Sequence, residues 1–141
     1  MELSLPGYIK KCLHRFGYHH PRRPQYSPHL EPIEKFTRTT PSLSSPDDAP
    51  KLDEKGIKRI QQICGSILWY MQVADVTTCK TLNTIGHKQP KATETTRHWA
   101  NWLLDYLATH PNRKTRFWQS NIRLLIHSDA SFLVEWDGKK Y

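Results

Sequence analysis

The chain has 141 residues, of which 37% are hydrophobic, and its 21 Lys and Arg against 13 Asp and Glu give a formal charge of +8. This length suits one modest domain, and the sequence has neither the ~20-residue apolar run of a membrane helix nor the charged-then-apolar start of a signal peptide. Three widely spaced cysteines (Cys12, Cys64 and Cys79) argue against a disulfide framework. We therefore expect an intracellular protein, cytoplasmic or nuclear, with no membrane partner. Its basic surplus favours nucleic acid as a partner.

Residues 1–18 contain one short amphipathic segment. Its apolar residues recur at intervals of three and four, as on one face of a helix: Tyr8, Ile9, Cys12, Leu13 and Phe16. Pro6 suits the first helical turn and Gly17 suits the end, and Lys10, Lys11 and Arg15 cover the opposite face. Because a helix this short is marginal alone, we predict a detached helix whose packing partner can lie outside this chain.

Residues 19–51 hold seven of the ten prolines. Proline removes backbone donors and blocks helix and inner strand, and residues 42–48 are polar without periodicity. The composition predicts an extended or disordered linker. A docking ligand for aromatic grooves is the alternative, but no clean P-x-x-P core with flanking anchors stands out.

Residues 52–112 show helical periodicity, first in a helix that is predicted to start after Asp53, a good N-cap, and to run to about Ala74. Its apolar stripe consists of Ile57, Ile60, Cys64, Ile67, Leu68 and Met71. Gly65 within the stripe predicts close approach by another backbone, and Trp69 is expected in the core.

Two further helices are expected in the same segment. One is predicted over residues 76–85, with Cys79 and Leu82 facing inward and Gly86 at its end. The other is predicted over residues 93–109. Its inward face consists of Trp99, Leu103, Tyr106 and Leu107.

After residue 112 the periodicity changes from helical to alternating. Short strands are predicted over residues 115–119, 122–127 and 132–136, and Asp137-Gly138 is a hairpin turn signal. The predicted fold is therefore α+β, with a short helix (1–18), a Pro-rich linker (19–51), a three-helix unit (52–112) and a small antiparallel sheet (113–141).

Asp129 is the sharpest candidate for chemistry because it follows an apolar strand. A carboxylate at a strand end is where two-metal nucleases hold Mg²⁺ or Mn²⁺, but such a site needs several carboxylates. On the local pattern alone, a turn-forming Asp is the simpler interpretation. Glu135 and Asp137, the acids downstream, flank the predicted hairpin turn and are expected on the surface.

Two other groups of residues are candidate sites. Trp118, which lies between Arg116 and Arg123, is the best candidate among five tryptophans for stacking on a base. Trp69 and Trp99, which stand at helical spacing, are expected in the core instead. A zinc site is disfavoured because the ligands that are close in sequence have no recognised spacing: Cys12, His14, His19 and His20.

The order of these parts resembles the copia-type retrotransposon Pol polyprotein, downstream of its polymerase palm. Residues 5–17, Leu-Pro-Gly-Tyr-Ile-Lys-Lys-Cys-Leu-His-Arg-Phe-Gly, look like the thumb helix of that family. Residues 63–70, in which apolar residues flank Gly-Ser, are similar to a second helix of the family. Residues 98–100 (His-Trp-Ala) and 104–107 (Leu-Asp-Tyr-Leu) resemble its His-Trp…Arg-Tyr-Leu helix.

Further likenesses lie at both ends of that helical region. Asp75 stands near the family's Arg-Pro-Asp, although Val73-Ala74 precede it here. Phe117 and residues 124–130, which end in Ser-Asp-Ala, resemble the start of its ribonuclease H domain. By this resemblance Asp129 is the first metal-binding carboxylate, catalytic in the parent, with Mg²⁺ or Mn²⁺ as the cofactor. The other carboxylates of that site, and the polymerase Asp-Asp pair, are expected outside residues 1–141, so the fragment is not expected to bind metal stably.

The resemblance implies a fragment that holds template–primer or an RNA–DNA hybrid, with the rest of the Pol polyprotein as its other partner, and that is inactive alone. Phosphate contacts are expected from Lys10, Lys11, Arg15, Arg113, Lys114 and Arg116. Two alternatives stay open. One is a domesticated, non-enzymatic module that binds nucleic acid or protein, and the other is a relic reading frame without a selected function.

Overall fold

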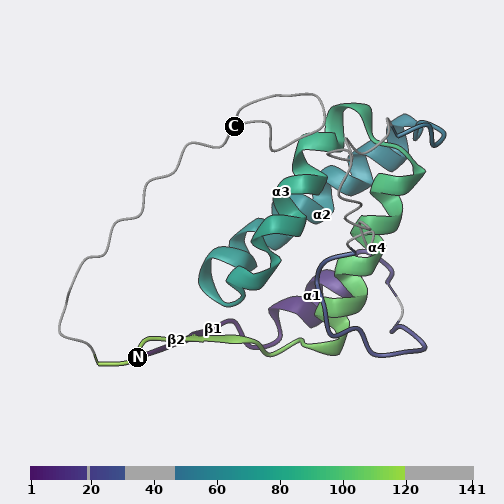
Figure 1. Ribbon diagram of the computed structural model, residues 1–141. Coiled ribbons are helices and arrows are strands. Elements are labelled where there is room, and N and C mark those ends of the chain that lie inside the picture. The colour runs from purple at the N-terminus through teal and green to yellow at the C-terminus, as the bar shows by residue number, and fades with distance from the viewer. Residues whose placement is uncertain (19, 31–46, 120–141) are drawn as a thin grey trace, which may run out of the picture. The chain divides into compact units, whose positions relative to one another are not determined.

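The computed structural model describes residues 1–18, 20–30 and 47–119. Contacts divide the chain into two units, and the first, Met1–Leu30 with Ala49–Phe117, holds every described helix and strand. It is a mixed α+β structure whose described residues form four α-helices and a two-stranded antiparallel sheet (Figure 1). Asp129 and the strands predicted over residues 122–127 and 132–136 lie outside the described residues.

The N-terminal segment forms a strand and a helix, where the sequence predicted a helix alone. The strand is β1 (Glu2–Ser4) and the helix is α1 (Tyr8–Arg15). Gly17 adopts the left-handed region at φ 60° and ends the helix as predicted. The Tyr18 N–H donates to the Leu13 carbonyl over 2.9 Å, which closes a Schellman motif.

α1 is not detached from the rest of the chain, so that prediction is wrong. Ile9 on its apolar face is 0% exposed and belongs to one core with residues of the later helices. The Tyr8 hydroxyl donates to the Ser66 carbonyl over 2.9 Å, and the rings of Tyr8 and Tyr70 stack with centroids 6.1 Å apart. The packing partner that a short helix requires is therefore supplied by this chain itself.

α2 (Glu54–Val73) begins where its N-cap predicts. The Asp53 carboxylate accepts a hydrogen bond of 2.8 Å from the Gly56 N–H, which satisfies one of the unpaired donors of the first turn. The buried side of the helix consists of Ile60, Ile63, Cys64, Ile67 and Tyr70. The predicted stripe was therefore rotated, because it omitted Ile63 and Tyr70.

The opposite side of α2 corrects three sequence predictions. Leu68 is 46% exposed and Trp69 is 56% exposed, although both were expected inside. Gly65 is exposed, and a side chain at this position would meet no described atom of another segment within 4 Å of its Cβ. No other described backbone segment therefore approaches Gly65 closely.

The second helical region is a 3₁₀ turn, η1 (Val76–Thr78), followed by α3 (Cys79–Lys88) and a second 3₁₀ turn, η2 (Gln89–Lys91). Leu82 is buried as predicted, and Cys79 is half-buried. Gly86 lies inside α3, so the predicted end there is wrong. A glycine inside a helix costs only about 1 kcal/mol, whereas Pro90 in η2 lacks the N–H that a continuing α-helix needs.

α4 (Glu94–Thr109) matches the predicted third helix. Thr93 caps it, and the Thr93 and Thr96 side chains form a reciprocal capping box. Leu103, Tyr106 and Leu107 are buried as predicted.

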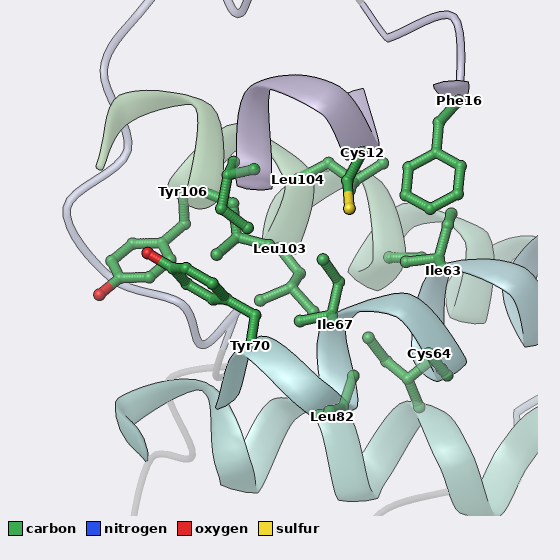
Figure 2. Packing of buried hydrophobic residues seen from close by; sticks show 14 of the residues in the cluster. Cys12, Phe16, Ile63, Cys64, Ile67, Tyr70, Leu82, Leu103, Leu104 and Tyr106 are labelled. Carbon is green, nitrogen blue, oxygen red and sulfur yellow. The ribbon is translucent and has the colours of Figure 1, made fainter. Parts of the chain in front are cut away.

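Residues from all four helices meet in one core (Figure 2). Its largest fully buried members include Tyr70, Tyr106, Ile9, Ile60, Ile63, Ile67, Ile85, Leu103, Leu104 and Leu107. Cys12 and Cys64 belong to the same core, and burial raises the pKa of both thiols. Neither thiol forms a disulfide, in agreement with the cysteine spacing.

Residues 20–30 contain no helix or strand, as the linker prediction required, but they pack on helices and are not a free spacer (Figure 1). The Trp102 indole N–H donates to the Ser27 carbonyl over 2.9 Å. The Thr81 hydroxyl donates to the carbonyl of buried Pro28 over 2.9 Å. Proline blocks regular structure but leaves its carbonyl free to accept hydrogen bonds from neighbouring elements.

The sheet joins two segments that lie far apart in the sequence. β2 (Lys114–Arg116) pairs antiparallel with β1, with Leu3 opposite Thr115. The strand predicted over residues 115–119 therefore starts one residue earlier and ends earlier. Side chains alternate between the two faces of a sheet along each strand. The side chains of two opposite pairs, Glu2 with Arg116 and Ser4 with Lys114, therefore lie on the same face.

Candidate nucleic-acid interface

Positive charge is concentrated on the first unit. Met1–Leu30 and Ala49–Phe117 contain sixteen Lys and Arg against six Asp and Glu, a formal charge of +10, which exceeds the +8 of the whole chain. The remaining residues therefore carry a formal charge of −2. A nucleic acid, the partner that the basic composition favours, would therefore be attracted most strongly to the first unit.

The cations of α1 lie on its solvent side. Because Ile9 and Leu13 face the core, Lys10, Lys11 and Arg15 are exposed. These three residues span about 7.5 Å of helix axis, which matches roughly two steps between successive phosphates, and so three phosphates, along one strand of a duplex. The helix thus presents the cations that the sequence assigned to phosphate contacts.

Two other predicted phosphate ligands are already paired within the chain. Lys114 Nζ lies 3.3 Å from Glu2 Oε2, and the Arg116 Nε–H donates to Glu2 Oε1 over 2.7 Å. The hydrogen bonds from Arg116 and then Lys114 lower the pKa of Glu2 below its ordinary value. The charged face of the sheet therefore has two cations against one carboxylate, and a phosphate must compete with Glu2 for them.

Glu2→Gln is expected to tighten binding of an RNA–DNA hybrid by about two- to fivefold at low salt, because phosphate no longer competes with a carboxylate for Lys114 and Arg116. The lowered pKa means that the ion pairs are present above the ordinary carboxyl value of 4.5 and are lost as the pH falls through the lowered value. Fluorescence anisotropy against pH should show the two proteins converging at acid pH. Equal affinity at neutral pH would show that Glu2 does not compete with phosphate.

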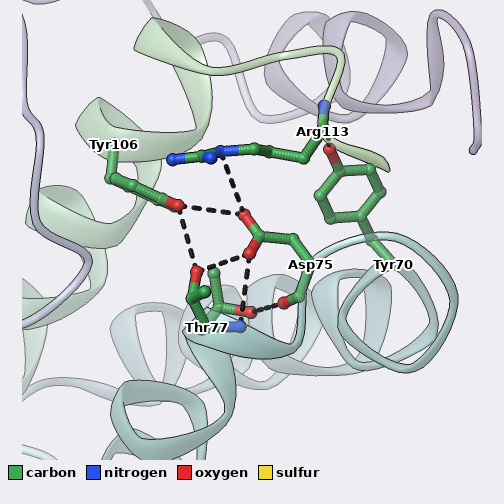
Figure 3. Close-up of polar contacts among 6 residues, drawn as sticks. Tyr70, Asp75, Thr77, Tyr106 and Arg113 are labelled. Carbon is green, nitrogen blue, oxygen red and sulfur yellow. Dashed lines mark hydrogen bonds and ion pairs between the residues drawn. The ribbon is translucent and has the colours of Figure 1, made fainter. Parts of the chain in front are cut away.

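Arg113 follows α4 and belongs to a polar network around buried Asp75 (Figure 3). One carboxylate oxygen of Asp75 accepts a hydrogen bond of 3.2 Å from the Thr77 N–H, and the other accepts one of 3.1 Å from the Tyr106 hydroxyl. Arg113 Nε lies 4.0 Å from the second oxygen, a charge contact and not a hydrogen bond. The guanidinium carbon of Arg113 is 5.7 Å from the centroid of the Tyr106 ring.

Buried tyrosines hold the backbone and side chain of Arg113. The Arg113 N–H donates to the hydroxyl of Tyr70 over 3.2 Å. Burial raises the pKa of both Tyr70 and Tyr106, so both phenols keep their protons at neutral pH. Tyr106 can therefore act as a hydrogen-bond donor to Asp75. Arg113 is contacted at two points, namely its backbone N–H by Tyr70 and its guanidinium by Tyr106 and Asp75.

Of the two remaining predicted site residues, Trp118 and Asp129, the structure describes only Trp118. Trp118 is 75% exposed, and its stacking on a base stays a prediction. Asp129 lies outside the described residues. Among the residues the structure describes, no group of three or more His, Cys, Asp or Glu could hold a metal ion.

Sequence reasoning missed the network around Asp75. One local signal was present, because an Asp two residues before a Thr favours a turn in which the carboxylate accepts the Thr N–H. Tyr106 and Arg113 lie 31 and 38 residues further along the chain, so only tertiary packing brings them to Asp75.

None of the helices in the described part of the chain combines the length and apolarity needed to cross a membrane. Comparisons of the chain with models of protein families, with curated proteins and with solved structures found no match.

Proposed function

We propose that this chain is the segment of a copia-type retrotransposon Pol polyprotein that joins reverse transcriptase to ribonuclease H. In this proposal the helical unit holds template–primer or an RNA–DNA hybrid and has no catalytic activity alone. The observation that carries the proposal is the formal charge of +10 on the first unit. A duplex with one negative charge per ~1.7 Å of axis binds such a surface through release of counterions, without contacts to the bases.

The short chain segment between the sheet and α1 keeps the cations of these two elements close together, which supports a single binding surface. β1 pairs with the strand that carries Lys114 and Arg116, and α1 begins four residues after Ser4. Four residues reach at most about 14 Å, so the start of the helix that carries Lys10, Lys11 and Arg15 is tied closely to the sheet. A duplex is wide enough to contact both elements at once.

Metal chemistry belongs to the full-length parent in this proposal. Asp129 would supply one carboxylate for Mg²⁺ or Mn²⁺, and cleavage by two ions needs further carboxylates around it. We therefore expect the isolated chain to bind a hybrid without cutting it.

The test is binding of the purified chain to a fluorescent RNA–DNA hybrid across a salt series, with Mg²⁺ present and cleavage followed in the same tube. With six candidate cations, the slope of log K against log salt should reach roughly −3 to −5. Salt-sensitive binding without cleavage supports the proposal. Absence of binding at low salt would refute it, and cleavage that disappears in Asp129→Asn would refute the claim of inactivity.

A protein-binding module is the second candidate, and exposed apolar residues on α2 and η1 favour it. Leu68 and Trp69 of α2 are 46% and 56% exposed, and Val76 of η1 is 65% exposed. Exposed apolar groups of this kind are typical of contact surfaces. Failure to bind the hybrid at low salt would leave this candidate in place.

A further inference from the structure

Arg113 is contacted at both its backbone and its side chain, and its guanidinium forms no hydrogen bond to a carboxylate of the described residues, unlike the Arg116 guanidinium, which donates to Glu2. Its backbone is bonded to Tyr70, and its guanidinium lies against the Tyr106 ring and the Asp75 carboxylate. The side chain is nevertheless 44% exposed, whereas that of Asp75 is only 3% exposed. Lys10 and Lys11 lie on the outer face of α1 and must lose more side-chain freedom when they bind an anion.

Asp75 is itself held in place before it meets Arg113. One oxygen accepts hydrogen bonds from both the N–H and the hydroxyl of Thr77, and the other accepts from Tyr106. Arg113 contributes a charge contact at 4.0 Å and takes none of these bonds. Among the described residues, no hydrogen bond occupies the two Nη groups of Arg113. The planar fork of a guanidinium suits two oxygens of one phosphate.

We infer that Asp75 and Tyr106 are positioning residues, which hold the Arg113 guanidinium as a preorganised contact for one phosphate of the bound duplex. This inference rests on the proposed function. The ligand is a phosphodiester group of the backbone, and the contact carries no sequence information.

Removing the charge of Asp75 distinguishes a positioning role from a simple effect of net charge, because the two predict opposite changes in affinity for the hybrid. If Asp75 only subtracts charge from the surface, Asp75→Asn makes the protein more positive and tightens binding. If Asp75 positions Arg113, the same change weakens binding, because the guanidinium loses its charged partner. Asp53→Asn is the matched control, since it removes the same charge from an N-cap where Asn is equally good and Arg113 is not involved.

The experiment measures affinity for the RNA–DNA hybrid and its salt slope for the full chain and for four variants: Asp75→Asn, Asp53→Asn, Tyr106→Phe and Arg113→Lys. Circular dichroism and thermal unfolding report separately on folding. Asp75→Asn is expected to weaken binding about five- to tenfold and to make the slope less negative by about 1. Asp53→Asn should bind as the unchanged chain does or up to about twofold more tightly.

Arg113→Lys and Tyr106→Phe keep the test decisive if Asp75→Asn does not fold. Arg113→Lys retains the charge but loses the planar fork, so it should weaken binding while its unfolding temperature changes little. Tyr106→Phe keeps the ring beside the guanidinium and removes the hydroxyl with its contacts to Asp75 and Thr77, so a smaller loss is expected.

The outcomes distinguish this inference from the proposed function. If Asp75→Asn matches Asp53→Asn, or Arg113→Lys matches the unchanged chain, the positioning role is refuted although the unchanged chain still binds the hybrid. If the unchanged chain shows no salt-sensitive binding, the proposed function and this inference both fail.

Discussion

Ile67→Ala is expected to lower the free energy of unfolding by about 2–5 kcal/mol, the range for an aliphatic side chain removed from a packed core. Ile67 is 0% exposed and lies within the cluster of α1, α2, α3 and α4 side chains (Figure 2). Small domains are stable by only about 5–15 kcal/mol, so this single change should remove a large part of the total. Urea unfolding followed by far-ultraviolet circular dichroism measures it.

The neighbouring residue supplies the control. Leu68 is 46% exposed, so Leu68→Ala should change the free energy of unfolding by no more than about 0.5 kcal/mol. Comparable losses at both positions would mean that α2 is rotated relative to the arrangement described above. The pair is informative because the sequence pattern places both residues on the same apolar stripe.

Replacing Lys10, Lys11 and Arg15 together with glutamine is expected to weaken binding of an RNA–DNA hybrid by about 10²- to 10³-fold at 0.1 M salt. Each phosphate contact contributes about 0.9 to the salt slope, so three lost contacts should make the slope less negative by about 2.7. The three side chains are exposed on α1, and glutamine is nearly as good a helix former, so folding should be preserved. Anisotropy titrations over a salt series give both quantities.

A charge-matched triple variant separates a local interface from general attraction. Lys55, Arg59 and Lys91 are also exposed, and their replacement with glutamine removes the same charge from α2 and η2. This control should lose far less affinity, because only the long-range field falls. Similar losses in the two triple variants would show that net charge, and not the α1 surface, governs binding.

Local signals in the sequence determined where α2 and α4 begin and where α1 ends. Asp53 and Thr93 cap α2 and α4, and Gly17 ends α1 in the left-handed conformation. These features depend on side chains and backbone groups within a few residues of one another, so they are readable without knowledge of the fold. The sequence likewise predicted three helices between residues 52 and 112, and the structure contains α2, α3 and α4 there.

Tertiary packing decided which apolar residues of α2 are buried. Helical periodicity allowed a stripe that includes Leu68, but α2 packs against α1, α3 and α4, and the side that faces them carries Ile63 and Tyr70, with Tyr70 stacked on Tyr8. Leu68 and Trp69 consequently face solvent. Nothing within α2 itself records the direction from which α1 approaches.

The candidate interface shows the same division. The sequence identified the cations, because charge is a property of each residue alone. It did not reveal that Glu2 pairs with Lys114 and Arg116, or that Asp75 and Tyr106 hold Arg113. Glu2 and Arg116 are 114 residues apart, and only the pairing of β1 with β2 brings them together. Local patterns therefore determined which charges the protein carries, whereas contacts between distant segments decided which of them are paired or positioned, since the energy of an ion pair depends on distance and burial.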